Sequence, residues 1–86
     1  MGTSDKILNN GITLYALDTW ADCKRAKSFF AEHRIEVNIK DFAVPKIARE
    51  VREKFGSENP PIILFKDKQF FGFKKNKDEI KRMLGI

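Results

Sequence analysis

The sequence contains one cysteine, Cys23, so no disulfide can form within the chain. It also contains a single histidine, and one thiol with one imidazole does not give the ligand spacing of a metal site. Its apolar runs are only a few residues long, whereas a membrane-spanning helix needs about 20 apolar residues. We therefore expect no metal ion, no membrane segment and a single hydrophobic core as the source of stability.

The 86 residues are enough for one domain and leave no room for a second. Residues 1–11 are polar and end in an Asn-Asn-Gly turn motif, so we expect a polar N-terminal tail before a domain over 12–86. The tail lacks the apolar core of a signal peptide, and a lone free thiol suits a reducing compartment. These features predict a cytoplasmic protein.

The net charge of +5 is concentrated in residues 66–86. A basic end of this kind can attract nucleic acid, a membrane surface or an acidic protein. Phe70, Phe71 and Phe73 lie among lysines, a mixture also found in proteins that bind single-stranded nucleic acid. A core-facing strand with a lysine-guarded edge gives the same pattern, so we expect neither a nucleic acid nor a membrane partner.

The first half of the chain reads as strand, helix, strand. Residues 12–17 are a short β-rich run, and Asp18 or Thr19 can cap a helix after it. Residues 35–42 alternate as a second strand. The expected buried stripe of the helix, at i, i+3, i+4 and i+7, is Ala26, Phe29, Phe30 and His33. On this stripe His33 is expected to be a packed residue rather than a base or a ligand.

The second half reads as helix, two strands, helix. Pro45 suits a first helical turn, and Gly56 a helix end. An unbroken apolar run over 62–65 predicts a buried central strand, which a connection at 66–68 joins to a strand over 69–73. The apolar stripe expected on the first of these helices is Ile47, Val51 and Phe55.

The last helix is expected to begin near Asn76, with Glu79 completing a capping box. Its apolar residues are Ile80, Met83 and Leu84. The resulting order β-α-β-α-β-β-α favours a parallel pairing of the first two strands through a right-handed crossover. The fold class is therefore α/β, with an antiparallel hairpin completing a four-stranded mixed sheet flanked by three helices.

The segment 19–27, T-W-A-D-C-K-R-A-K, resembles the active site T-C-P-x-C-x-R-A-K of the glutaredoxins and NrdH-type redoxins, small members of the thioredoxin-like superfamily. Tyr15 and Thr19 also match the family pattern, and the resemblance covers roughly residues 12–84. It implies a thioredoxin-like fold. It places Cys23 at the second, resolving cysteine and Trp20 at the position of the nucleophile.

Two further segments carry the resemblance. Pro61 stands before the third strand, where the family has a cis-proline, and Pro60 precedes it. Phe71-Gly72-Phe73-Lys74 is similar to Ser-Gly-Phe-Arg of NrdH-type redoxins, whereas glutathione-using glutaredoxins have Gly-Gly. The resemblance implies a partner-binding surface formed by Tyr15, Thr19, Pro60, Pro61, Gly72 and Phe73.

In the family the first thiolate attacks a disulfide, and the second cysteine releases the product. Trp20 cannot attack, so the dithiol cycle is not expected to run. Glutathione is not expected to supply the missing thiol. In the family a lysine at the position of Leu17 contacts a glutathione carboxylate, and the residue at the position of Pro60 donates an N–H that proline lacks. Phe73 also fills the position of a glycine that the ligand approaches. We therefore expect no cofactor.

The resemblance implies a monomeric electron carrier that acts on protein thiols or disulfides, with a thioredoxin reductase or a ribonucleotide reductase as partners by analogy. Whether the chain is an enzyme stays open, because the attacking sulfur is missing. A shifted alignment would make Cys23 a monothiol nucleophile. Arsenate-reductase and Spx-like proteins share the helix start but carry an insertion that this chain lacks. The other alternative is a non-catalytic binding protein that uses the Trp20/Pro61 surface.

Overall fold

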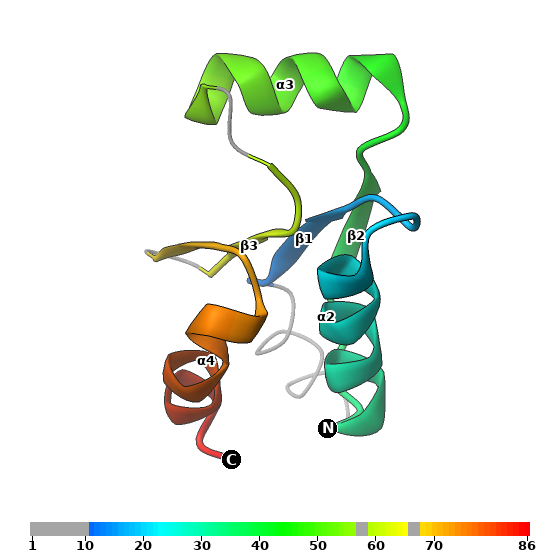
Figure 1. Cartoon of the computed structure of the whole chain (residues 1–86). Helices are drawn as coiled ribbons and strands as arrows, with labels where there is room; N and C mark the ends of the chain where they lie inside the picture. The colour runs from blue at the N-terminus through cyan, green and yellow to red at the C-terminus, as the bar shows by residue number, and fades with distance from the viewer. Residues whose placement is uncertain (1–10, 57–58, 66–67) are drawn as a thin grey trace, which may run out of the picture.

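The computed structural model describes residues 11–56, 59–65 and 68–86. The observed order of elements confirms the predicted β-α-β-α-β-β-α arrangement, with a short 3-10 helix added before the last helix (Figure 1). Residues 1–10 of the expected tail, and 66–67 of the expected connection, lie outside the described residues. The elements are β1 (Thr13–Ala16), α2 (Ala21–Glu32), β2 (Asn38–Asp41), α3 (Pro45–Phe55), β3 (Ile62–Leu64), β4 (Gln69–Phe71), η1 (Lys74–Asn76) and α4 (Lys77–Leu84).

The four strands form one mixed sheet in the order β2-β1-β3-β4. β1 and β2 are parallel, and α2 is the crossover between them. β1 and β3 are antiparallel with Leu14 opposite Ile63, and β3 and β4 are antiparallel with Ile63 opposite Phe70. The predicted mixed sheet is therefore confirmed, with the apolar strand β3 in its interior.

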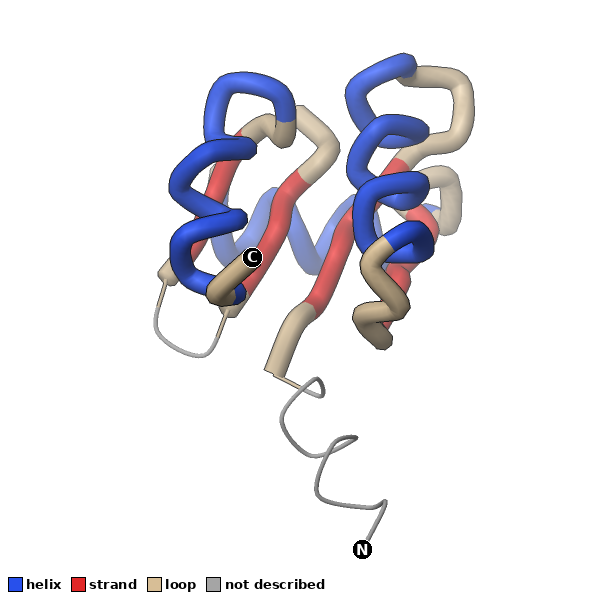
Figure 2. Tube along the Cα trace, turned by 90° about the horizontal axis from the view of Figure 1, so that it is seen from below, coloured by secondary structure: helices blue, strands red, loops and turns tan. Residues whose placement is uncertain are grey.

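Alternation along the strands divides the core between the two faces of the sheet. One face is covered by α2 and α4, which lie side by side in front of the sheet in Figure 2, while α3 lies behind it. In β1, Leu14 and Ala16 belong to the first face and Tyr15 to the second. The helix residues that are buried on the first face are Cys23, Ala26, Phe29, Phe30 and Ile80.

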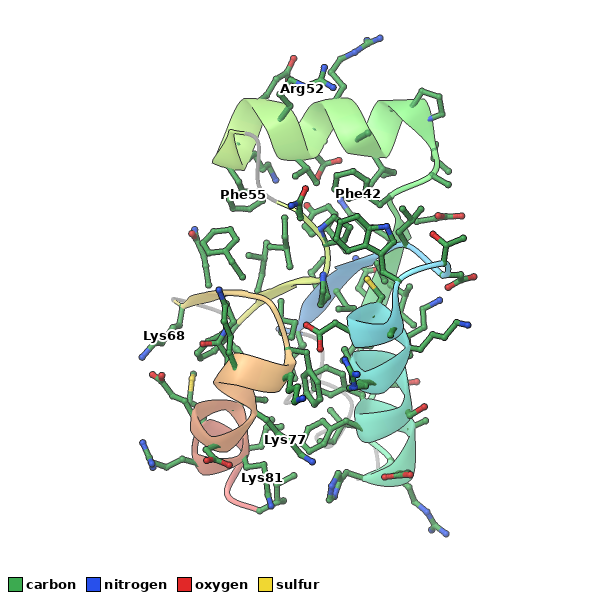
Figure 3. The ribbon with its side chains drawn as sticks, in the orientation of Figure 1. Phe42, Arg52, Phe55, Lys68, Lys77 and Lys81 are labelled. Atoms are coloured by element: carbon green, nitrogen blue, oxygen red, sulfur yellow. The ribbon has the colours of Figure 1, made fainter. Side chains whose placement is uncertain are left out.

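The core under α3 is smaller. Val51 packs with Tyr15 and Ile62, and Ile47 and Phe55 are partly buried beside them, as the helical spacing predicts. Figure 3 shows Phe42 and Phe55 between α3 and the sheet and Arg52 on the outer side of the helix. Pro45 is in the first turn of α3 and Gly56 caps its end with φ of 80°, both as expected.

The expected start and end of α2 were wrong in detail. Its N-cap is Trp20, without a side-chain cap hydrogen bond, because Asp18 pairs with Lys27 instead. His33 is exposed rather than buried and forms the C-cap, with its ring centroid 4.6 Å from that of Phe29. The helix ends at Glu32, so the i+7 position of the expected stripe falls beyond its last turn.

The expected capping box of α4 is also wrong. Asn76 donates its side-chain amide to the carbonyls of Phe71 at 3.2 Å and Gly72 at 2.8 Å, so it satisfies the turn after β4 and not the helix. Glu79 pairs with Lys68. Ile80 is buried and Leu84 packs against the core, but Met83 is 43% exposed. At about 3.6 residues per turn, Met83 and Leu84 lie on opposite sides of Ile80, and the core covers the side of Leu84.

Candidate functional site

The N-terminal turn of α2, the segment before β3 and the turn after β4 meet at one end of the sheet. Together they line a cavity of about 690 Å³, which we call the proline pocket. Its residues are Asp22, Arg25, Asn59, Pro60, Phe71, Gly72, Lys74 and Lys75. Three of these are cationic, so the pocket is basic. This is the place where the sequence predicted a redox site.

Pro60 and Pro61 are joined by a cis peptide bond, as the resemblance implied, and both are buried. The carbonyl of Pro61 accepts a hydrogen bond of 2.9 Å from the N–H of Gly72. Gly72 has φ of 97°, a conformation that favours glycine. The turn after β4 is thereby held against the proline segment, and both form walls of the proline pocket.

Cys23 lies in the first turn of α2 and is completely buried. Its Sγ accepts a hydrogen bond of 3.3 Å from the N–H of Leu17. Burial is the main cause that raises the pKa of the Cys23 thiol, and the nearby carboxylate of Asp22 adds to it, while the Leu17 bond acts in the opposite direction. The arrangement keeps a protonated, shielded thiol rather than an exposed thiolate.

Trp20 is the residue immediately before α2, and its side chain is 40% exposed. Its N–H donates to the carbonyl of Leu17 at 3.0 Å, and its own carbonyl accepts from the N–H of Lys24 at 3.2 Å. Thr19 is exposed in the same turn. These bonds hold the backbone at Trp20, and its exposed indole offers an apolar contact and no nucleophile.

Phe73 and Tyr15 are both buried in the core. Phe73 is 3% exposed and packs against Phe29, with ring centroids 5.2 Å apart and ring planes inclined at 51°. Tyr15 belongs to the α3 face, where its hydroxyl donates to Glu50 at 2.7 Å, and it is not among the residues that line the proline pocket. Of the candidate binding residues, Pro60 and Gly72 line this pocket.

Asp22 is a site residue that sequence reasoning missed. Its carboxylate accepts hydrogen bonds from the N–H groups of Phe73 at 2.8 Å and Lys74 at 3.0 Å, and it lies 3.3 Å from the guanidinium of Arg25. The partners are more than 50 residues away in the sequence, so no local pattern points to them. The acidic residue in the first helical turn was the one available hint.

Neither a metal-binding cluster nor a membrane-spanning helix is found in the part of the chain that the structure describes. His, Cys, Asp and Glu side chains do not gather there in groups of three or more that could hold a metal ion. None of the helices there is long and apolar enough to cross a membrane.

Comparison with solved structures places the fold among the glutaredoxins and thioredoxin-like proteins. A glutaredoxin from Archaeoglobus fulgidus superposes with a TM-score of 0.71 at 21% identity, covering 87% of this chain and 86% of the other. A variant of the thioredoxin-like protein BC3987 gives 0.75 at 19% identity, covering 88% and 96%. Glutaredoxin 1 from Francisella tularensis, in complex with cacodylate, gives 0.66 at 19% identity, covering 87% and 96%.

No protein-family model and no curated protein matches the sequence. The likeness to the solved structures therefore establishes the thioredoxin-like fold that the sequence predicted.

Proposed function

We propose that the protein is a glutaredoxin/NrdH-like small redox protein of the thiol–disulfide oxidoreductase class, with a W-A-D-C site that cannot run the dithiol cycle. The observation that carries this proposal is the proline pocket, where Pro60 of the cis-proline pair and Asp22 of the first turn of α2 are brought together. A surface of this kind can hold an extended protein segment beside the start of α2, next to Trp20.

The chemistry requires two sulfurs. In the dithiol cycle a thiolate attacks a partner disulfide, one partner sulfur leaves as a thiolate, and a second thiol of the carrier then displaces the other partner sulfur. Trp20 has no sulfur, and Cys23 is the only cysteine in the chain. Cys23 is also buried with a raised pKa, so the fraction of reactive thiolate at neutral pH is small. Electron transfer to protein disulfides, the activity of the class, therefore needs a sulfur at position 20.

The proposal excludes glutathione as a cofactor. Pro60 has no N–H to donate to a ligand in the proline pocket. The N–H groups of Phe73 and Lys74 already donate to Asp22, so a ligand carboxylate finds these two donors occupied. The remaining polar groups that line the pocket are mainly exposed side chains, which orient a small ligand poorly.

The proposed partner is a protein thiol or disulfide, with a thioredoxin reductase or a ribonucleotide reductase as analogues from the class. We propose a monomer by analogy with the class, and a cytoplasmic location because a lone free thiol suits a reducing compartment. Neither nucleic acid nor a membrane is a proposed partner. The exposed indole of Trp20 and the cations of the proline pocket supply the contacts for a protein surface.

The test is to restore the sulfur. Trp20→Cys is expected to reduce insulin disulfides with dithiothreitol as the electron source, whereas the wild-type protein and Trp20→Ser are expected to be inert. Trp20→Ser is the matched control because it removes the indole without adding a thiol. A Trp20→Cys variant that keeps its circular dichroism spectrum yet stays inert would contradict the redox assignment of this surface.

A second candidate function is a non-catalytic binding protein that uses the Trp20/Pro61 surface. The pairing of an exposed indole with a buried, protonated Cys23 favours it, because exposed aromatic residues are common anchors at protein interfaces. This function predicts that Trp20→Ala loses capture of a specific protein partner while Ile39→Ala, which removes a side chain of similar exposure on β2, retains it. Equal capture by both variants would rule this function out.

A further inference from the structure

A second pocket continues the proline pocket along the space between α2 and α4. It has a volume of about 320 Å³, and we call it the helix pocket. It shares Arg25 and Lys74 with the proline pocket, so the two adjoin at this pair. Its other residues are Ser28, Phe29, Glu32, Phe73 and Lys77. The two pockets together form one groove, the basic groove, which runs from Pro60 to Lys77.

Cations outnumber carboxylates along the basic groove. Lys74, Lys75 and Lys77 are exposed, and no ion pair between described residues includes them. Figure 3 shows Lys77 on the side of α4 that faces α2. Arg25 is paired with Asp22, whose charge is also met by two backbone N–H groups. Glu32 is the remaining carboxylate, at the far end of the groove.

The way in which Asp22 is bound restricts what the groove can recognise. It occupies the N–H groups of Phe73 and Lys74, which are the fixed donors that a single compact anion would need. The donors left over are long side chains spaced along the groove. They suit an extended ligand with several separated negative charges, and each charge adds a weak, salt-sensitive contribution.

The floor of the groove argues against nucleic acid. Phe29 and Phe73 are 6% and 3% exposed, so little of either ring is open for a base to stack on. Glu32, at the far end of the groove, would also repel a phosphate backbone that follows the groove to that end. A polypeptide can avoid this carboxylate, because its own charges are spaced by neutral residues.

We propose that the basic groove docks an extended acidic segment of the protein partner. This inference rests on the proposed function only in taking the partner to be a protein. Carboxylates of the segment pair with Arg25, Lys74, Lys75 and Lys77, while its neutral side chains lie against the Phe29–Phe73 floor. Because the groove begins at Pro60, one end of a docked segment lies beside the first turn of α2.

The probe is a fluorescein-labelled peptide in which Glu and Asp alternate with Val, measured by fluorescence anisotropy. The same peptide with Lys in place of each acidic residue, and a single-stranded oligonucleotide, are the comparison ligands. We expect the acidic peptide alone to bind, and its affinity to fall on going from about 0.05 to about 0.5 M sodium chloride. The groove variant is Lys74→Gln/Lys75→Gln/Lys77→Gln, in which we expect binding to weaken by about tenfold.

The matched control makes the same change of charge on the outer surface of α3, across the sheet from the groove (Figure 1). It is Lys46→Gln/Arg49→Gln/Arg52→Gln, and all three of its positions are exposed. We expect this control to bind the acidic peptide within about twofold of wild type, because it keeps the groove intact. In the wild-type protein, amide resonances of residues 25–32 and 74–77 are expected to shift when the acidic peptide is added.

Equal loss of binding in the two triple variants would mean that net charge alone acts, and it would overturn the proposal. So would resonance shifts confined to other elements, absence of binding by the acidic peptide, or preferred binding of the oligonucleotide. The proposed function fails separately, since an inert Trp20→Cys variant is measured with insulin and leaves the peptide result unaffected.

Discussion

The carboxylate of Asp22 in α2 accepts a hydrogen bond of 2.8 Å from the backbone N–H of Phe73, 51 residues further along the chain. Lys74 donates a second bond at 3.0 Å to the same side chain. Both N–H groups lie at the start of η1, where a helical turn leaves its first donors without intrahelical partners. Asp22 therefore ties α2 to the turn after β4 and holds together two walls of the proline pocket.

Asp22→Ala is expected to lower the free energy of unfolding by about 1–2 kcal/mol, because it leaves two donors in a partly buried turn without their charged acceptor. Urea denaturation followed by circular dichroism measures the change. Asp18→Ala is the control: its carboxylate is exposed and forms a surface pair with Lys27, so no measurable change is expected. An Asp22→Ala variant as stable as Asp18→Ala would show that the two hydrogen bonds contribute nothing.

Glu50 is the centre of a second polar cluster, between α3 and the sheet. It accepts hydrogen bonds from the hydroxyl of Tyr15 at 2.7 Å and the ammonium of Lys40 at 2.9 Å. The bond from Tyr15, and then that from Lys40, lowers the pKa of Glu50 to about 2 from its ordinary value of 4.5. A carboxyl with a lowered pKa stabilises the fold at pH values above its ordinary pKa. This contribution to stability is lost as the pH falls from 4.5 toward 2.

Glu50→Gln is therefore expected to be less stable than wild type at neutral pH but to lose less stability on acidification. The measurement is the urea midpoint at a series of pH values between about 7 and 2. Parallel curves for the two proteins across this range would contradict the prediction. Glu53→Gln on the exposed side of α3 removes one carboxylate without touching the cluster, and its curve is expected to parallel that of wild type.

The same cluster affects the single tyrosine. Burial first, and then the bond to Glu50, raises the pKa of Tyr15 to about 12. Because Tyr15 is the only tyrosine in the chain, ultraviolet difference absorbance follows its titration directly. We expect a midpoint near 12 in the wild-type protein and a lower one in Glu50→Gln, still above 10.0 because burial remains. A wild-type midpoint at 10.0 in folded protein would show that the hydroxyl is not held in this way.

Gly72 is required for its backbone conformation. With φ of 97°, an added Cβ would be strained and would lie 3.0 Å from Cε of Lys75. Gly72→Ala is expected to destabilise the protein by about 1–2 kcal/mol, measured by thermal unfolding. Gly11→Ala is the control, because nothing lies within 4 Å of its added Cβ. Equal unfolding temperatures for the two variants would mean that the turn can adopt another conformation.

The layers of the fold follow from local patterns in the sequence. Alternation in β1 and helical spacing in α3 indicate which side chains face the core, and both are properties of neighbouring residues. The capping predictions failed because the expected capping side chains bond to other groups nearby instead. Asp18 is held by Lys27, and Asn76 by the carbonyls after β4.

The site was predictable only in part. Helical spacing predicted Ala26, Phe29 and Phe30 on the buried stripe of α2, and the stripe also includes Cys23, which the prediction left out. The contact of Asp22 with Phe73 and the basic groove between α2 and α4 could not be predicted in this way. They depend on how far the turn after β4 approaches α2 once the sheet has formed, and no short sequence window encodes that distance.

The burial of Cys23 leads to the remaining prediction. A thiol whose pKa is raised by burial carries less thiolate at a given pH, so alkylation of the folded protein is expected to be slow and to have a midpoint above the ordinary thiol value. The pH dependence of iodoacetamide labelling, read by intact mass, measures both, and the urea-unfolded chain gives the reference rate. Because the raised pKa stabilises the fold only while the thiol is protonated, the free energy of unfolding is also expected to fall as the pH rises above the ordinary pKa of a thiol.

Leu17→Ala keeps the N–H that donates to Sγ and opens the partly buried layer beside it, so faster labelling of Cys23 is expected in this variant. Fast labelling of the wild-type protein with a low midpoint would mean that Cys23 reaches solvent as a thiolate, and a monothiol exchange would then have to replace the site proposed here.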